Sequence, residues 1–314
     1  MMDKRRTNTL RSLFAWALLT LVAAMCAGPA TARAQTYVDN MGREVRLDTP
    51  PQRIIALIPS LTEIVFALGL GERMVGATQW ADHPQEARSL PRVGDYQTPS
   101  MESILSLAPD LVLVEGGGNP PWVVEQLEVA NIPVFVTWIR DPRQVPEIIE
   151  LLGAVCGVPE RGRDLAREIQ AKFDRVERMV HGIRPVRTLF IIGNRPVVSV
   201  GKDTFPDRLL TMAGAENLAA DASGSWPRLS FDTILQSRPE AIIVSTMERG
   251  AERESLEQFW RNQPGIGTLQ GLRIHSVQSD LVDRPGPRLG QGLTLLAEIL
   301  HPGLFPDTRE NRGP

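Results

Sequence analysis

The sequence contains few of the residues that usually carry chemistry. Its 314 residues include two cysteines, two tyrosines and four histidines, and the histidines stand far apart at His83, His181, His275 and His301. It has no G-x-S-x-G nucleophile turn and no H-E-x-x-H zinc helix. A zinc or manganese receptor would need several converging histidines and carboxylates, or a histidine-rich loop. We therefore expect neither an enzyme nor a receptor for free metal ions.

The first 34 residues differ in composition from the rest of the chain. Lys4, Arg5, Arg6 and Arg11 precede the apolar run LFAWALLTLVAAMCA, which is followed by TARA. A basic head, an apolar segment of about 15 residues and a small-x-small site are typical of a secretory signal peptide. A permanent membrane span would take about 20 apolar residues. We therefore expect export, with cleavage after Ala34.

Cysteine is almost absent from the exported chain. Cleavage removes Cys26, and Cys156 alone remains, so the mature chain can form no intramolecular disulfide. Lipid attachment at Cys26 is the alternative, but Met25 stands where a small residue is expected. Cys156 lies in the apolar helical segment IIELLGAVCGVP, which favours a small buried residue. We expect free release and a structural role for this cysteine.

A basic cluster is also missing. Removing the signal peptide takes away five basic residues and one acidic residue, so the formal net charge changes from −3 to −7. Proteins that bind nucleic acid present a basic patch to the phosphates. An acidic exported chain without such a patch predicts no nucleic-acid partner.

From Arg53 onward, short apolar runs alternate with helical patterns. RIIALIP predicts a buried strand, and SLTEIVFALGLG predicts a helix in which Ser60 and Glu63 have capping-box spacing and Gly69 or Gly71 marks the end. Strands separated by helices indicate a parallel sheet covered on both faces. Residues 121–131 and 142–157 predict further helices, and residues 73–78 and 132–138 predict further strands.

Residues 159–183 form a longer and more charged segment. An apolar residue recurs at every third or fourth position, which predicts one buried stripe on a helix about 36 Å long. Pro185 follows, and the strand pattern resumes with RTLFIIG. The stripe consists of Leu165, Ile169, Phe173, Val176 and Val180.

Two segments, 130 residues apart, repeat the same pattern without a gap. GDYQTPSMESILSLAPDLVLV begins at Gly94, and GSWPRLSFDTILQSRPEAIIV begins at Gly224. In each copy a serine precedes a helix that it can cap, and an acid follows in the first turn, where the helix dipole favours it. The acids are Glu102 and Asp232. Capping and dipole suffice to explain either acid alone, whereas the pair suits a two-fold partner that presents arginines.

The aromatic residues of the repeat stand among polar and turn-forming residues. Tyr96 and Trp226 lie in the loops before the two helices, and loops on a rigid scaffold are where binding groups collect. Two flat side chains from two lobes could hold a flat ligand between them. The alternative is that each aromatic packs beneath its own loop.

Several segments resemble a known family. MESILSLAPDLVLVEGGGN, GAENL, SWPRLSFDTILQSRPEAIIV and DRPGPRL occur in the same order in the periplasmic binding proteins of iron-siderophore, haem and vitamin B12 importers. The likeness covers nearly the whole mature chain and is greatest for the vitamin B12 members. It implies an α/β fold of two Rossmann-like lobes with parallel sheets, joined by one long backbone helix (the helical-backbone, or class III, architecture).

The resemblance also implies a location and partners, and the pattern of strands and helices along the chain predicts a domain plan. The protein would be a periplasmic, monomeric binding protein without a cofactor, which delivers its ligand to an ABC transporter permease dimer in the inner membrane. The expected segments are a signal peptide (1–34), an N-terminal lobe (35–155), a connecting helix (156–185), a C-terminal lobe (186–302) and a loose tail (303–314).

Site residues carry over from the family position by position. Tyr96, Trp226 and Trp80 fall on ligand-facing aromatics, Gly117 and Asn119 fall in a cleft loop, and Arg284 and Arg288 fall near the ligand. Glu102 and Asp232 fall on the acids that dock onto permease arginines. Asp232 stands where the B12 proteins have glutamate, so it keeps the charge but has a shorter reach.

The ligand itself stays open between related compounds. A corrinoid is preferred, because aromatic walls would bury its flat faces while Asn119 and the glycine loop meet its amides. Haem is the rival, with Tyr96 and His83 as candidate iron ligands and Arg284 and Arg288 for the propionates. Ferric siderophores usually require a more basic cleft.

Overall fold

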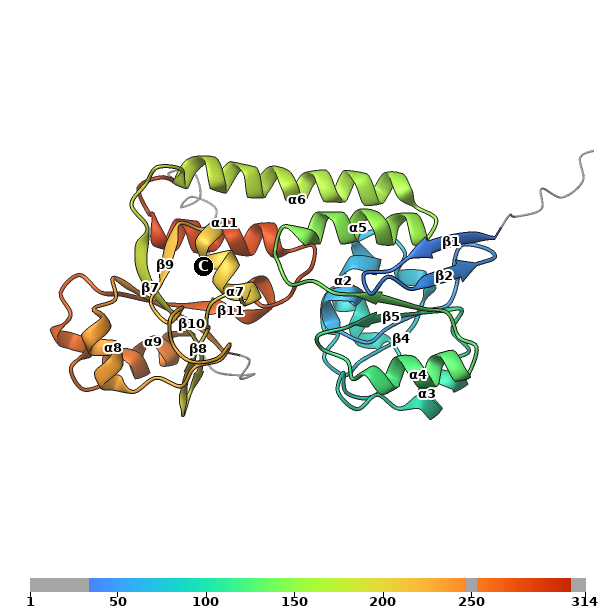
Figure 1. The fold of residues 1–314 in the computed structure, drawn as a ribbon, viewed down its shortest axis with the longest axis horizontal. Helices are drawn as coiled ribbons and strands as arrows, with labels where there is room; N and C mark the ends of the chain where they lie inside the picture. Colours follow the sequence, from blue (N-terminus) through green and yellow to red (C-terminus); the bar gives the residue numbers. More distant parts are fainter. Residues whose placement is uncertain (1–33, 247–252, 306–314) are drawn as a thin grey trace, which may run out of the picture. The chain divides into compact units, whose positions relative to one another are not determined.

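The computed structural model describes residues 34–246 and 253–305 (Figure 1). The predicted signal peptide lies outside the described residues except for Ala34, and so does residue 306 onward of the predicted tail. Among the described residues, no helix combines the length and apolar character needed to cross a membrane. The described residues divide into two compact units, a small one of residues 34–36 with Arg46–Thr49 and a large one that holds the rest.

The described part of the chain begins with two short strands, followed by a parallel four-stranded sheet with the order β4-β3-β5-β6. The apolar runs predicted as strands form it, and helices connect each strand to the next, as parallel pairing requires. The strands are β1 (Gln35–Val38), β2 (Glu44–Leu47), β3 (Ile54–Ala56), β4 (Met74–Ala77), β5 (Leu111–Glu115) and β6 (Val134–Thr137). The helices are α2 (Pro59–Ala67), η1 (Gly71–Arg73), η2 (Gln85–Ser89), α3 (Met101–Ser106), α4 (Pro121–Val129) and α5 (Gln144–Val155).

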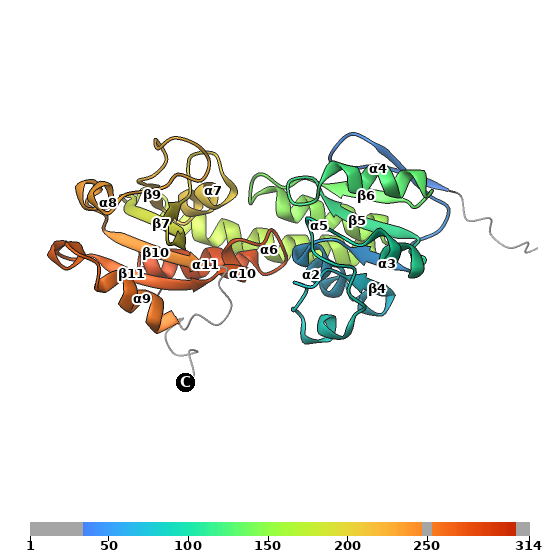
Figure 2. The ribbon, with the colours of Figure 1, turned by 90° about the horizontal axis from the view of Figure 1, so that it is seen from below.

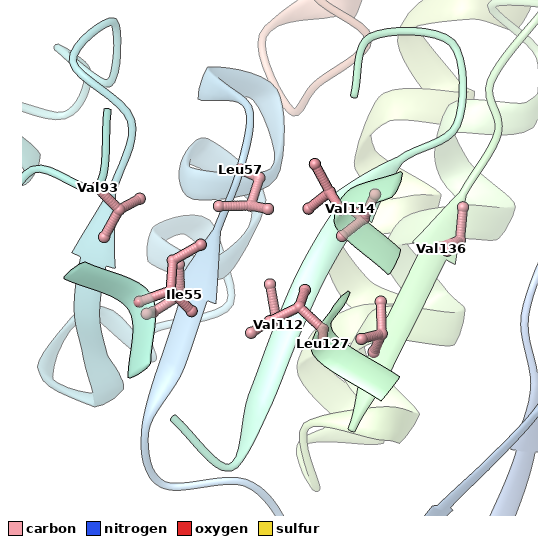
Figure 3. Close-up of a cluster of buried hydrophobic side chains, with 10 residues drawn as sticks. Ile55, Leu57, Val93, Val112, Val114, Leu127 and Val136 are labelled. Atoms are coloured by element: carbon pink, nitrogen blue, oxygen red, sulfur yellow. The ribbon is translucent and has the colours of Figure 1, made fainter. Parts of the chain in front are cut away.

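Both faces of this sheet are buried. On one face the strand residues pack against side chains of α3 and α4 (Figure 3). Alternate residues point to the opposite face, and Ile54, Leu113 and Phe135 there are buried as well. This double burial explains why the strands appear as continuous apolar runs. The first face contains Ile55, Leu57, Val93, Ile104, Val112, Val114, Val123, Leu127, Val134 and Val136.

The second half of the chain forms a five-stranded sheet with the order β11-β10-β7-β8, in which β9 also pairs with β7. All pairs are parallel except the β7–β8 hairpin. The strands are β7 (Val186–Asn194), β8 (Val197–Ser199), β9 (Ala215–Asn217), β10 (Ala241–Thr246) and β11 (Arg273–Gln278). The helices are α7 (Phe205–Met212), α8 (Phe231–Ser237), α9 (Arg253–Arg261), η3 (Ile266–Thr268), α10 (Ser279–Val282) and α11 (Leu289–Leu300).

One long helix, α6 (Pro159–Val180), stands between the two sheets in the sequence and packs along α5 and α11 (Figures 1 and 2). Its buried side follows the predicted stripe at Ile169, Phe173 and Val176. The stripe begins differently, because Gly162 and Ala166 are buried where Leu165 was expected to be. Small residues at that end let α6 approach α5 closely. The α/β fold with parallel sheets and one long helix is therefore confirmed.

The sequence also predicted how the helix α2 starts and ends. The capping box at Ser60 is wrong: the N-cap is Ile58, two residues earlier, Pro59 is the first residue of α2, and no side chain caps the helix. Glu63 is instead drawn into ion pairs with distant arginines. Gly69 does end this helix, with φ of +74°.

Cys156 is buried, as its apolar setting predicted. Burial raises the pKa of its thiol to about 12, so the thiol stays protonated and unreactive at neutral pH. Its carbonyl oxygen accepts a hydrogen bond from Arg73, so the residue contributes through its backbone as well as its packing.

The close approach of α5 and α6 can be tested at Gly153. A Cβ added there would lie 2.7 Å from the Cα of Gly162, so the two helix backbones would have to separate. We expect Gly153→Ala to lower the free energy of unfolding by about 1–3 kcal/mol, although alanine favours an isolated helix by about 1 kcal/mol.

Urea unfolding of the mature chain measures this change. The control is Gly267→Ala, because a Cβ at Gly267 meets nothing within 4 Å. Equal stability of Gly153→Ala and the control would show that the two helices tolerate a wider spacing.

Candidate functional site

The two copies of the sequence repeat adopt the same local structure. Gly94 and Gly224 both have positive φ, at +95° and +84°. Ser100 and Ser230 are the N-caps of α3 and α8, and each hydroxyl accepts a hydrogen bond from the backbone N–H three residues later. The capping prediction is confirmed in both copies.

The two copies of the repeat also share contacts that the sequence did not show. Arg53 donates from its guanidinium to the carbonyl oxygen of Leu107, and Arg187 donates in the same way to Ser237, which is the repeat equivalent of Leu107. Ala108 and its equivalent Arg238 both take positive φ, at +44° and +46°. The segment around α8 therefore repeats the local contacts of the segment around α3, although the two sheets differ in strand number and order.

The repeated acids lie at the surface. Glu102 and Asp232 occupy the first turns of α3 and α8, and both are exposed. Neither makes an ion pair with another residue in the part of the chain that the structure describes. The two carboxylates are thus available to an outside partner.

Tyr96 is held by its backbone in the loop between Gly94 and α3. Its carbonyl oxygen accepts a hydrogen bond of 2.7 Å from the side-chain amide of Asn119. The same amide donates to Leu57, and the Asn119 carbonyl accepts from the N–H of Glu115. Asn119 is buried, and its side-chain oxygen and nitrogen both take part in these hydrogen bonds. Asn119 therefore positions the Tyr96 loop.

Trp80 follows β4, and its side chain is held by an acid from the loop that carries Tyr96. Its indole N–H donates to Asp95 at 2.5 Å, and Gln79 donates to the same carboxylate oxygen at 2.8 Å. The backbone N–H of Gln97, together with the Trp80 and Gln79 donors, lowers the pKa of Asp95. The carboxylate is therefore ionised over a wide pH range and keeps Trp80 in one orientation.

Glu115 organises the glycine loop that follows β5. It is buried, and its two carboxylate oxygens accept from the N–H groups of Gly117 and Ile139. Burial raises the pKa of Glu115, although these N–H donors act in the opposite direction. The glycine loop and the segment after β6 are thereby joined through one side chain.

Trp226 is the most exposed of the expected ligand-facing aromatics, with 53% of its surface accessible. The chain on either side is hydrogen bonded to the end of β8, since Ser199 and Gly201 donate to the carbonyl oxygens of Pro227 and Ser225. A rigid loop that presents an exposed indole contradicts packing of Trp226 beneath its own loop.

Arg284 and Arg288 meet a buried carboxylate from the first half of the chain. Arg288 binds both oxygens of Glu63, at 2.8 and 2.7 Å, and Arg284 binds Glu63 and Asp82, each at 3.0 Å. Burial opposes the charge of Arg284, but Asp280, Glu63 and Asp82 outweigh it and raise its pKa. In this structure both arginines are engaged by carboxylates.

A second acid beside this cluster is also buried. Asp283 accepts a hydrogen bond from Ser245 at 2.7 Å through Oδ2, while Oδ1 has no partner among the residues that the structure describes. Burial raises the pKa of Asp283 to about 7, the Ser245 hydrogen bond opposes this shift, and the negative charge of Asp280 adds to it. Asp283 is therefore mostly protonated below about pH 7 in the folded protein.

The structure thus links several of the expected residues and leaves others separate. Hydrogen bonds join Tyr96, Asn119 and the Gly117 loop, whereas Arg284 and Arg288 belong to the Glu63 cluster. His83 is exposed. No group of three or more histidines, cysteines or carboxylates suited to a metal ion occurs among the described residues.

The sequence interpretation missed the acids that position these groups. Glu63, Asp95, Glu115 and Asp283 were not identified as parts of a site. Glu115 carried one signal, because it ends the otherwise apolar strand LVLVE. Asp95 and Asp283 stand in turn-rich loops, where an acid is unremarkable.

The fold matches those of solved structures. The periplasmic haem-binding protein of Roseiflexus sp. RS-1 superimposes with a TM-score of 0.70 and 28% sequence identity, over 81% of this chain and 99% of that one. The fold is that of a helical-backbone, class III periplasmic binding protein.

Sequence comparison agrees with the fold. The family described as periplasmic binding protein matches residues 54–272, so the chain belongs to that family. The vitamin B12-binding protein of Vibrio campbellii is 28% identical over 79% of this chain and 89% of its own length. An uncharacterized ABC transporter substrate-binding lipoprotein of Bacillus subtilis is 31% identical over 92% of this chain and 97% of its own length.

The raised pKa of Asp283 predicts a pH-dependent stability. Between about pH 4 and pH 7 the unfolded chain has lost this proton while the folded chain keeps it, so stability falls as the pH rises. We expect Asp283→Asn to abolish this fall. Relative to the wild type, the variant should gain a few kcal/mol, on the order of 4 at most, between pH 4 and pH 7.

Urea unfolding at several pH values measures the difference between variant and wild type. Asp232→Asn is the control, since Asp232 is exposed. If the difference for Asp283→Asn stays constant with pH, the buried carboxyl group titrates as an ordinary aspartate.

Proposed function

We propose that this protein is the substrate-binding component of an ABC importer and that it carries a corrinoid. The ligand lies between the carboxyl edges of the two sheets, against Tyr96, Trp80 and Trp226, with Gly117 and Asn119 behind it. The observation that carries this proposal is the fixing of these aromatics in loops at strand ends, with a hydrogen-bonded backbone or side chain behind each. The relative named as a vitamin B12-binding protein supports it.

The physical reason is the match between stiff aromatic surfaces and a large flat ring. Aromatic side chains bury much apolar area and lose little conformational entropy on binding when they are already held in place. The amide fringe of a corrinoid suits backbone groups of the glycine loop. Binding and transport need no cofactor and no catalysis by this chain.

The protein acts in the periplasm as a monomer that meets an inner-membrane permease dimer. Glu102 and Asp232 are the docking residues, because they are exposed, unpaired among the described residues, and placed equivalently in the two halves of the chain. Two equivalent carboxylates suit a partner that has two equivalent subunits.

The domain plan accompanies this proposal. The N-terminal lobe spans 35–155, the connecting segment 156–185 and the C-terminal lobe 186–302, preceded by a signal peptide at 1–34 that is cleaved to release the protein. A loose tail at 303–314 ends the plan. The observed α6 lies inside the proposed connector.

Haem is the second candidate ligand. The Tyr96 phenol oxygen has no hydrogen-bond partner in the described part of the chain, so it is available to an iron atom. The solved haem-binding relative from Roseiflexus also favours this candidate. Against it, Arg284 and Arg288 pair with Glu63, so haem propionates would compete with a buried carboxylate for them.

Titration of the purified mature protein separates the two ligands. We expect cyanocobalamin to bind with measurable heat, and Trp226→Ala to weaken binding about tenfold through the lost ring contact. Calorimetry and absorbance measure both ligands on one preparation. A haemin Soret shift without any heat from cyanocobalamin would overturn the corrinoid assignment.

Charge reversal tests the docking residues. The double variant Glu102→Arg, Asp232→Arg should bind ligand within about twofold of the wild type but fail to deliver it, because like charges would then face each other at the permease. Ligand uptake by permease-containing vesicles measures delivery.

The matched control is Glu125→Arg with Asp221→Arg. These two acids are also exposed and lie in the two halves of the chain. If the first pair of reversals abolished ligand binding itself, Glu102 and Asp232 would belong to the ligand site or to the fold.

A further inference from the structure

An additional aromatic residue follows β6. Trp138 comes directly after the last residue of this buried strand and keeps 36% of its surface accessible. The guanidinium carbon of Arg140 lies 5.7 Å from the centre of the Trp138 ring. An arginine over an indole face is a favourable cation–π arrangement, and it restricts the movement of both side chains.

Trp138 lies beside the glycine loop. A Cβ on Gly116 would be 3.7 Å from the Trp138 ring, and the N–H of Gly116 donates to the carbonyl oxygen of Thr137. The carboxylate of Glu115 joins the two segments by accepting from Gly117 and Ile139. Contacts therefore run without a break from Trp138 through this loop to Asn119 and the Tyr96 backbone.

The strand order places Trp138 across the sheet from Trp80. Trp80 follows β4 and Trp138 follows β6, at the two outer strands of the order β4-β3-β5-β6. Three strand spacings separate these edges, about 14 Å. The carboxyl edge of the sheet thus has an indole at each side. The glycine loop follows β5 between them, and the segment that leads to Tyr96 is hydrogen bonded to the end of β4.

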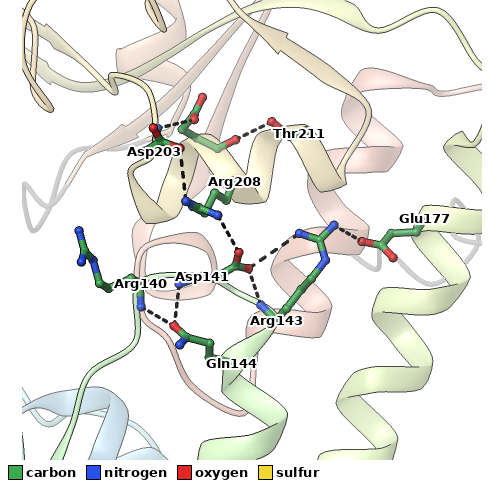
Figure 4. A network of polar contacts seen from close by, with 9 residues as sticks. Arg140, Asp141, Arg143, Gln144, Glu177, Asp203, Arg208 and Thr211 are labelled. Atoms are coloured by element: carbon green, nitrogen blue, oxygen red, sulfur yellow. Dashed lines mark hydrogen bonds and ion pairs between the residues drawn. The ribbon is translucent and has the colours of Figure 1, made fainter. Parts of the chain in front are cut away.

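The backbone of Arg140 is held by hydrogen bonds, whereas its guanidinium has no ion pair among the described residues. Its N–H and that of Asp141 both donate to the side chain of Gln144, and Asp141 pairs with Arg208 of α7 (Figure 4). The Arg140 side chain extends away from this network, and its guanidinium makes no ion pair with a described residue. The neighbouring Arg143, by contrast, is paired with Glu177.

A positioned guanidinium without a carboxylate suits an oxyanion. Its planar fork forms two parallel hydrogen bonds with a carboxylate or a phosphate, and it is less strongly hydrated than an ammonium group. The adjacent indole offers an apolar face to the ring that carries such a group. Arg284 and Arg288 do not offer this, because Glu63 already occupies them.

We propose that Trp138 and Arg140 form a further ligand subsite, in which Arg140 binds an oxyanion at the edge of a macrocyclic ligand and Trp138 packs against the ring beside it. This rests on the proposed function. The oxyanion has two possible sources, the propionates of a porphyrin and the phosphodiester in the nucleotide loop of a corrinoid. Either source gives the same charge-assisted hydrogen bonds to Arg140.

The test uses two pairs of probes that differ in the oxyanion. Haemin is compared with haemin dimethyl ester, and cyanocobalamin is compared with dicyanocobinamide, which lacks the phosphate. For the pair that the wild type binds, Arg140→Gln should weaken the oxyanion-bearing probe about ten- to hundredfold and leave its counterpart within about twofold. Trp138→Ala should weaken both members of the pair, and Trp138→Phe should restore most of the affinity.

The matched control is Arg175→Gln, which removes an exposed arginine from α6. Urea unfolding shows that each variant is folded. If Arg140→Gln weakens both members of a pair equally, or neither, the subsite is wrong while the proposed function stands. If the wild type binds no probe of either pair, the proposed function fails together with the subsite.

Discussion

The loops at the strand ends depend on one kind of interaction, the hydrogen bond from a backbone N–H group to a side-chain carboxylate. Glu115 holds Gly117 and Ile139, and Asp39 accepts from the N–H groups of Met41, Arg43 and Val136. A hydrogen bond to an ionised carboxylate is stronger than one between neutral groups. A binding loop has few apolar contacts of its own, so these acids supply the rigidity that packing gives elsewhere.

The same construction appears in both halves of the chain. Asp110 accepts from the N–H groups of Gln52 and Arg53, and its repeat equivalent Glu240 accepts from the N–H of Arg187. Each acid ties the start of one strand to the start of its neighbour. Repetition of these contacts implies that the loops before α3 and α8 are presented in the same way relative to their own sheets. Equivalent aromatics and equivalent acids follow from that presentation.

Some arginines of this protein form ion pairs that stabilise the fold, whereas others are available to bind a ligand. Arg284 and Arg288 share the buried Glu63, where removal of one partner would leave an uncompensated charge away from water. Arg140 stands on a well-anchored segment with no such partner among the described residues. The distinction matters for a binding protein, because an arginine that already has a carboxylate gains little from a ligand oxyanion.

The sequence by itself determined the α/β class, the long helix α6, the serine caps of α3 and α8, and the burial of Cys156. These depend on local periodicity, on a hydroxyl three residues from its N–H, or on an apolar neighbourhood along the chain. Only the tertiary structure decided that Glu63 pairs with two arginines that lie 221 and 225 residues further along the chain. It likewise decided that the side chain of Asn119 forms hydrogen bonds with backbone groups. It also decided that the Arg140 guanidinium makes no ion pair with any residue that the structure describes. A side chain's partners come from strands and helices distant in sequence, and which of them are near enough to bond depends on how the elements pack.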